Sequence, residues 1–248
     1  MKTIASLLFA IFTFSAIAQD AKEIIRKADE KNRGNSSKGE VTIKIQRPKW
    51  SREMTMKTWS YGTDYSMTLV TSPAKEKGMG FLKREKEVWN WVPRVERLIK
   101  LPPSMMMQSW MGTDFTNDDL VKQSSIVDDY DHKILGDSTI ENRKCWKIEM
   151  IPHEDAAVVW GKVVVWIDQQ EYIQMKVKSF DEDGFLVSTL NAFDVKNMGG
   201  KVIATRLEMI PADKENHKTI FIQNSMEFDV KDLNPDFFTP QNLKRIRL

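Results

Sequence analysis

PPSMMMQSWMGTDFTNDDL, residues 102–120, separates two long runs of strand-like sequence and follows a different periodicity from either. Pro102 and Pro103 end the preceding strand, because proline cannot donate a hydrogen bond to a β-ladder. The apolar side chains after the two prolines recur at helical spacing and predict one stripe. That stripe consists of Met106, Met107, Trp110 and Met111. The stretch therefore predicts a helical insert between two β regions.

The same insert carries signals for the ends of its helical pieces. Gly112 is placed to end the first piece as a C′ glycine. Thr116 can cap a second piece, with Asp119 at N3 reaching back to it in a capping box. Phe115 and Leu120 have the spacing of a hydrophobic staple. We therefore expect two short helical pieces hinged at Gly112.

The apolar stripe of this insert has two interpretations. Most such stripes only cover a core, and the residues by themselves favour that interpretation. The alternative is a lid over an apolar cavity, because methionine is unbranched and polarizable and adapts to a flexible ligand. Three consecutive methionines near a tryptophan fit that alternative. Both interpretations stay open on the sequence.

Alternating apolar and polar residues on both sides of the insert predict antiparallel strands. The pattern favours roughly ten or eleven strands in meander order, joined by tight turns. Helical signals occur at residues 20–32, in the insert, and near the C-terminus, where Asn234 and Thr239 each precede a proline. Because strands do not alternate with long helices, a parallel sheet is not expected. The predicted fold is mainly β: a strongly curved antiparallel sheet or unclosed β-barrel, with short helices covering its concave face.

The composition limits the function classes. The chain has 248 residues, of which 41% are hydrophobic, and its Lys+Arg count of 37 nearly balances an Asp+Glu count of 35. A nucleic-acid partner is not expected, since it needs a concentrated basic face. Cys145 is the single cysteine, so no intrachain disulfide forms, and we expect it to pack as a small hydrophobe.

The N-terminus has the pattern of an export signal. Lys2 supplies the positive region, residues 4–14 are apolar but too short to span a bilayer, and Ala16-Ile17-Ala18 is an A-x-A cleavage site. A transmembrane anchor is the alternative interpretation. We expect a signal peptide over residues 1–18, cleavage after Ala18 and a periplasmic chain of one domain, residues 19–248.

Recognisable catalytic or metal-binding motifs are missing from the sequence. The histidines His132, His153 and His217 are far apart and have no metal-ligand spacing. An acidic connector with Asp128, Asp129, Asp131 and His132 could gather a cation, but a solvated loop is the favoured interpretation. No nucleophile elbow, dinucleotide fingerprint or P-loop is present. We therefore expect no enzyme activity, no cofactor and no metal.

Several stretches resemble one bacterial family. SWMGTDFTNDDL (109–120) resembles the signature stretch of LolA-like outer-membrane lipoprotein-sorting proteins. GFLKREKEVWNWVPRVERLIKLP (80–102), VVVWIDQQEYIQMKVKSFDEDG (163–184) and a leader followed directly by a short helix are similar to the same family. The resemblance implies an unclosed β-barrel with a helical lid and a hydrophobic cavity. It also implies an arginine that latches the lid; Arg47 lies near the right region, but the match is not residue by residue. The central insert is longer than in those carriers.

The function expected from these observations is a periplasmic carrier. It would bind lipidated protein or another lipid and move it towards the outer membrane, as a monomer, between an inner-membrane transporter and an outer-membrane acceptor. An accessory subunit of an envelope transporter that binds protein is the first alternative, and an exported hydrolase with a dispersed active site is the second. The expected cavity and lid residues are Trp89, Trp91, Met106, Met107, Trp110, Met111 and Phe115.

Overall fold

A computed structural model describes residues 20–121, 125–156, 158 and 160–246. Within these residues, thirteen strands form one antiparallel sheet in the order β6-β5-β4-β3-β2-β1-β13-β12-β11-β10-β9-β8-β7. The strands are β1 (Ser36–Arg47), β2 (Trp50–Tyr61), β3 (Tyr65–Ser72), β4 (Gly80–Arg84), β5 (Glu87–Val92), β6 (Arg97–Lys100), β7 (Tyr130–Ile140), β8 (Arg143–Pro152), β9 (Lys162–Asp168), β10 (Gln174–Phe180), β11 (Leu186–Met198), β12 (Lys201–Pro211) and β13 (Lys218–Phe228).

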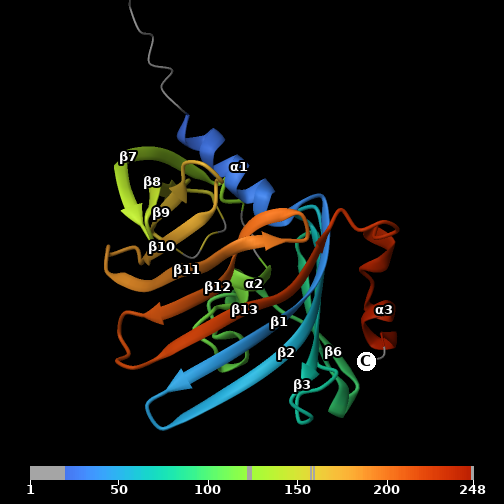
Figure 1. The fold of residues 1–248 in the computed structure, drawn as a ribbon. Coiled ribbons are helices and arrows are strands. Elements are labelled where there is room, and N and C mark those ends of the chain that lie inside the picture. The colour runs from blue at the N-terminus through green and yellow to red at the C-terminus, as the bar shows by residue number, and fades with distance from the viewer. Residues whose placement is uncertain (1–19, 122–124, 157, 159, 247–248) are drawn as a thin grey trace, which may run out of the picture.

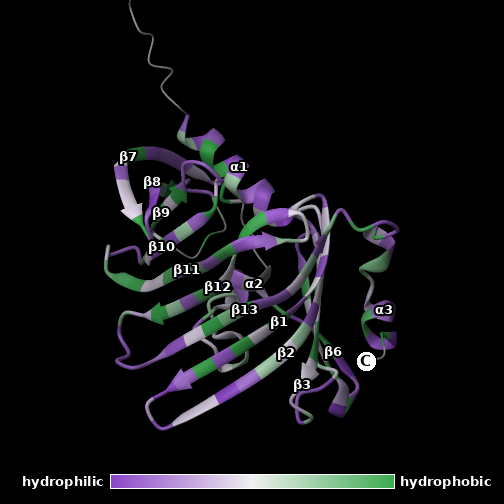
Figure 2. Ribbon diagram, in the orientation of Figure 1, coloured by the Kyte–Doolittle hydropathy of each residue, from purple (hydrophilic) through white to green (hydrophobic). Residues whose placement is uncertain are grey.

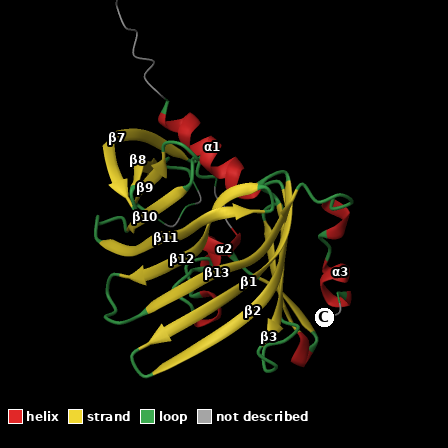
Figure 3. Ribbon diagram, viewed as in Figure 1, coloured by secondary structure: helices red, strands yellow, loops and turns green. Residues whose placement is uncertain are grey.

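The sheet curls strongly but does not close (Figures 1 and 3). Its two edge strands are β6 and β7. This confirms the predicted fold class, while the predicted number of strands was too low. Strand β7 was missed because it is an edge strand with many exposed positions, so that its sequence resembled a polar connector.

The order of the strands determines where the insert must run. Successive strands pair as hairpins, and the two halves of the chain join where Ser37 on β1 lies opposite Phe228 on β13. Strand β6 therefore lies at one edge of the sheet and β7 at the other. The segment between them has to cross from edge to edge, and Figure 1 shows its helix α2 (Asn117–Val121) inside the curve of the sheet.

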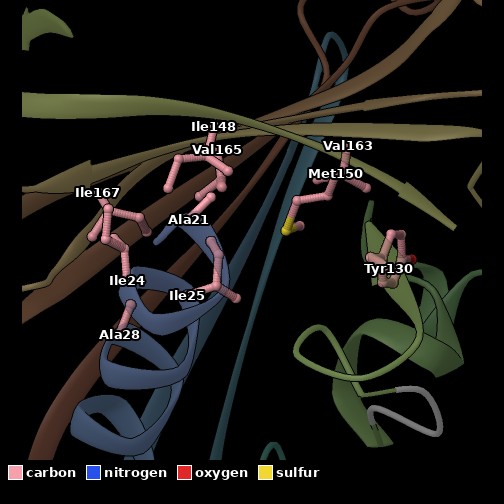
Figure 4. Close-up of a cluster of buried hydrophobic side chains, with 10 residues drawn as sticks. All are labelled: Ala21, Ile24, Ile25, Ala28, Tyr130, Ile148, Met150, Val163, Val165 and Ile167. Atoms are coloured by element: carbon pink, nitrogen blue, oxygen red, sulfur yellow. The ribbon is translucent and has the colours of Figure 1, made fainter. Parts of the chain in front are cut away.

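Helix α1 (Ala21–Arg33) covers the concave side of the C-terminal half of the sheet. The Asp20 side chain accepts a hydrogen bond from the Lys22 amide at 3.0 Å, and Gly34 ends the helix at φ 64°. Figure 4 shows its apolar side chains against strands β8 and β9. The predicted first helix is thus confirmed. The alternating hydropathy of the strands is visible in Figure 2.

The C-terminal segment covers the opposite, convex face. It contains the 3-10 turn η4 (Pro235–Phe237) and helix α3 (Pro240–Arg245), and Figure 1 shows α3 outside the sheet. Leu243 packs so closely on strand β4 that a Cβ at Gly80 would lie 2.4 Å from it. The caps at Asn234 and Thr239 are confirmed, but the expectation that all helices cover the concave face is wrong. Among the described residues, no helix has the length and apolar character needed to cross a membrane.

Candidate binding cavity

A cavity of about 500 Å³ lies between the concave face of the sheet, helix α1 and the insert. Most of its wall is apolar, with contributions from Ile25 of α1, Val41 and Ile43 of β1, and Val165 of β9. Cavities of roughly 300–1,000 Å³ with mostly apolar walls are typical of small-ligand sites. The curved sheet produces this space because its concave face cannot be filled by its own side chains alone.

The insert that closes this cavity is less regular than its sequence suggested. It consists of 3-10 turns at Pro103–Met105 and Trp110–Gly112, followed by α2. Met111 and Gly112 have positive φ values of 49° and 76°, which interrupt any helix at that point. The predicted helical stripe is therefore wrong. The predicted capping box is confirmed, because the Asp119 Oδ2 atom accepts from the Thr116 amide at 2.8 Å and the Asp119 amide donates to Thr116 Oγ1 at 3.1 Å.

Two of the expected cavity residues line this cavity. Trp110 and Phe115 are both buried in its wall, and the Trp110 amide donates to the Phe115 carbonyl at 2.8 Å. The Trp110 ring packs on Phe81 of β4 with a centroid separation of 5.1 Å. Trp110 also belongs to a buried cluster with β1 and β2 side chains. The insert thus contributes both to a core and to a cavity wall.

The three methionines of the predicted stripe do not line the cavity. Met106 is buried against Val88 and lines a separate hollow of about 510 Å³. Met107 is 49% exposed, and Met111 packs at the edge of the Trp110 cluster. Without a continuous helix, residues spaced by three or four positions no longer share a face, which explains the difference.

Trp89 and Trp91 lie on the opposite side of the sheet from the cavity. Trp89 lies directly opposite Leu82, and both belong to a cluster with Leu243 of α3. The Lys244 ammonium group lies 5.2 Å from the centroid of the Trp91 ring. Alternation predicted that the two tryptophans share a face, but it could not show that this face is the convex one.

A buried ion pair attaches the insert to the β1–β2 end of the sheet. Arg47 Nη1 donates to Asp114 Oδ2 at 2.9 Å, and Arg47 Nη2 donates to the Gly112 carbonyl at 3.0 Å. The two side chains of the pair are 9% and 5% exposed. Thr219 on β13 donates to the same Asp114 oxygen at 2.7 Å, and Arg52 donates to the Met111 carbonyl. Three residues of the insert, at positions 111, 112 and 114, are thus held to the sheet by three side chains.

Comparisons with known proteins agree with this architecture. A family model described as "Uncharacterized protein" matches residues 62–245. An outer membrane lipoprotein-sorting protein domain from Vibrio parahaemolyticus is 22% identical over 91% of this chain and 98% of its own, with a TM-score of 0.80. A LolA superfamily protein from Nitrosomonas europaea is 24% identical over 90% and 99%, with a TM-score of 0.76. The chain belongs to the family that this model describes, and it has a LolA-like fold.

A third solved structure extends this comparison. It is a DUF1329 family protein from Desulfovibrio piger, 19% identical over 90% of this LolA-like chain and 97% of its own, with a TM-score of 0.81. No curated protein matches the chain. At these identities the likeness shows the LolA-like fold and carries no residue-level role.

The cavity of this LolA-like chain also has a polar end that the sequence analysis missed. Ser37, Ser60, Ser66 and Lys83 line it from four adjacent strands, and Arg33 lines it from the end of α1. The sequence did contain a signal for this polar end, since hydroxyl side chains at 58 and 60 alternate with aromatic ones at 59 and 61. That alternation places them on the same face as Met56, which lines the cavity.

The other titratable side chains considered in the sequence, those of Cys145 and of the acidic connector, are in environments that have a structural explanation. Burial raises the pKa of the Cys145 thiol to about 11, in agreement with the expected small hydrophobe. Asp129 accepts a hydrogen bond from the Ser125 amide at 2.7 Å, and the His132 ring lies 2.7 Å from the Ile126 carbonyl. Over the described part of the chain, no group of three or more acidic, histidine or cysteine side chains has a geometry suited to a metal ion.

Arg47→Lys should loosen the insert while leaving the sheet intact. Lysine keeps the charge but lacks the planar fork that reaches Asp114 and the Gly112 carbonyl together. We expect a loss of about 1–2 kcal/mol in stability and faster amide hydrogen exchange at residues 110–117, with unchanged exchange in β1 and β13. Arg94→Lys, at an exposed arginine, is the control. Equal exchange in both variants would show that Arg47 does not hold the insert.

Proposed function

We propose that this protein is an exported, non-enzymatic carrier that holds the acyl chains of a lipidated protein or another lipid in its cavity. The observation that carries the proposal is the apolar cavity between the concave face and an insert that the Arg47–Asp114 pair attaches to the sheet. An acyl chain gains from leaving water in proportion to the apolar area that it buries. The insert closes the cavity as a lid, and Arg47 and Asp114 form its latch.

The remaining parts of the proposal concern location and partners. Export to the periplasm rests on the leader at residues 1–18, which lies outside the described residues, and on the LolA-like fold. The two solved structures described as lipoprotein-sorting or LolA proteins support a route towards the outer membrane. In this route an inner-membrane transporter loads the carrier and an outer-membrane acceptor unloads it. We propose that residues 19–248 act as one monomeric unit.

Lipid binding is the direct test. An environment-sensitive hydrophobic dye should bind the purified protein and be displaced by a fatty acid or a lipopeptide at micromolar concentration. Native mass spectrometry of protein made in its own host should show retained acyl ligands. A protein that binds neither dye nor lipid would contradict the carrier and favour an adaptor that binds protein.

A cavity-filling pair of variants localises that binding. Leu207→Trp places a large ring in the cavity, where Leu207 is partly exposed, and should lower lipid affinity with little change in the melt. Leu186→Trp makes the same change at an exposed position near a turn and serves as the matched control. If both variants bind lipid as well as the unaltered protein, the ligand lies elsewhere.

A further inference from the structure

The polar end of the cavity is built from a row of side chains that crosses four strands. Ser37 on β1 lies opposite Ser60 on β2, and their hydroxyl oxygens are 2.7 Å apart. Ser66 on β3 lies opposite Ser60 on one side and opposite Lys83 on β4 on the other. All four line the cavity. The row is therefore continuous and combines hydroxyl groups with one ammonium group.

A second row of hydroxyl groups lies one step deeper. Thr58 and Thr68 are opposite each other on β2 and β3, and both line the cavity. The next inward-facing positions are apolar, with Phe81 beside Thr68 and Met56 beyond Thr58. The cavity wall over β1–β4 thus changes from hydroxyl and cationic groups at one end to apolar groups at the other. This gradient matches the two parts of an amphiphile.

Two cations converge at this polar end. The Lys83 side chain is only 6% exposed, and its Nζ atom donates to the Thr63 carbonyl at 2.9 Å in the β2–β3 turn. Arg33, the last residue of α1, also lines the cavity and pairs with Asp29 of the same helix. Burial lowers the pKa of the Arg33 guanidinium, and Asp64 of the same β2–β3 turn opposes that shift.

Carboxylates also line the cavity, and their positions determine whether the charge at its polar end is positive or negative. Asp118 and Asp119 enter from α2 of the insert, and Asp119 serves in the capping box with Thr116. Asp29 and Asp64 do not line the cavity. The sheet and α1 therefore present cations and hydroxyl donors to the cavity, whereas its acidic groups belong to the segment that we propose as the lid.

We propose that this polar end is a headgroup subsite for an anionic lipid, whose carboxylate or phosphate is held by Lys83, Arg33 and the serine hydroxyls while its acyl chain occupies the apolar end. This inference rests on the proposed carrier function and narrows its cargo. Charge-assisted hydrogen bonds from buried cations are the strongest available to such a headgroup. Arginine and lysine together favour an anion over an uncharged glyceride.

The test compares headgroups on one acyl chain. Dye displacement is measured with a fatty acid, a lysophosphatidate, a monoacylglycerol and an alkyl trimethylammonium, and with inorganic phosphate alone. We expect both anionic lipids to bind about tenfold or more tightly than the monoacylglycerol. Equal affinity for all four amphiphiles, or tighter binding of the ammonium, would overturn the headgroup subsite without contradicting the proposed carrier function. Absence of binding by every amphiphile would overturn the carrier and the subsite with it.

Variants locate the effect at the polar end. Lys83→Met keeps most of the apolar length and should remove most of the preference for anionic lipids, with monoacylglycerol affinity unchanged. Lys57→Met, at an exposed lysine on the other face of β2, is the matched control. Ser66→Ala removes one hydroxyl without a change in charge, and we expect a roughly three- to tenfold loss for the anionic lipids only.

Two results would refute the assignment of these residues. The first is an anion preference that survives both Lys83→Met and Ser66→Ala in folded protein. The second is Lys83-dependent binding of inorganic phosphate that does not compete with the anionic lipids, which would indicate a free-anion site. Phosphate that displaces lysophosphatidate weakly, and only from protein with Lys83 intact, supports the headgroup subsite.

Discussion

Ile148→Glu is expected to unfold the protein. Ile148 is fully buried on β8 between the sheet and helix α1, in the cluster shown in Figure 4, and it is not part of the cavity wall. A glutamate there has no cationic partner among the cluster residues. An uncompensated buried charge costs about 3–5 kcal/mol, and the lost packing of isoleucine adds to it. The total is comparable to the whole stability of a domain, about 5–15 kcal/mol.

The matched control for this variant lies three residues away on the same strand. Ile151 is 41% exposed, so that a glutamate at 151 stays in water and should change stability by less than about 0.5 kcal/mol. Thermal melts followed by circular dichroism separate the two variants. If Ile148→Glu melts as Ile151→Glu does, α1 does not pack on this part of the sheet.

Trp110→Ala should have the largest effect of any change in the insert. The ring is 3% exposed, packs on Phe81, and lies in the cluster with Val41 and Ile43. Truncating a buried tryptophan to alanine costs about 3–5 kcal/mol. For a chain of this size the melting temperature should fall by roughly 10 °C.

This variant decides how far the insert acts as core and how far as a lid. Met107→Ala, 49% exposed on the same insert, is the control and should melt like the unaltered protein. If the insert left the sheet readily, Trp110→Ala would hardly change the melting temperature. The deep burial of Trp110 favours a large effect, so that opening the insert must break this contact as well as the Arg47 latch.

Local sequence signals predicted the local structure well. Asp20 and Gly34 mark the ends of α1, Thr116 and Asp119 form the expected capping box, and the diproline follows the end of β6. These features depend on contacts within a few residues, where side-chain chemistry and backbone geometry are coupled directly. The alternating pattern likewise predicted antiparallel strands and a mainly β fold.

The candidate site was predicted less well, for reasons that differ between residues. Trp110 and Phe115 lie in the cavity wall, whereas Trp89 is on the convex face and Met107 points to solvent. A methionine-rich run satisfied helical spacing, but the positive φ at Met111 broke the helix that the spacing required. Strand β7 was missed because an exposed edge strand carries a weak apolar pattern.

The sequence by itself determined which residues alternate, where helices start and stop, and that the strands form an antiparallel sheet. Only the tertiary structure decided which face became concave, because a period of two distinguishes the faces of a strand without saying which one curls inward. The same holds for the latch and the polar row. Arg47 and Thr219 both bind Asp114. Ser37 lies opposite Ser60, Ser60 opposite Ser66, and Ser66 opposite Lys83 through pairing across the sheet. Such contacts join residues far apart in the chain, so no local pattern specifies them.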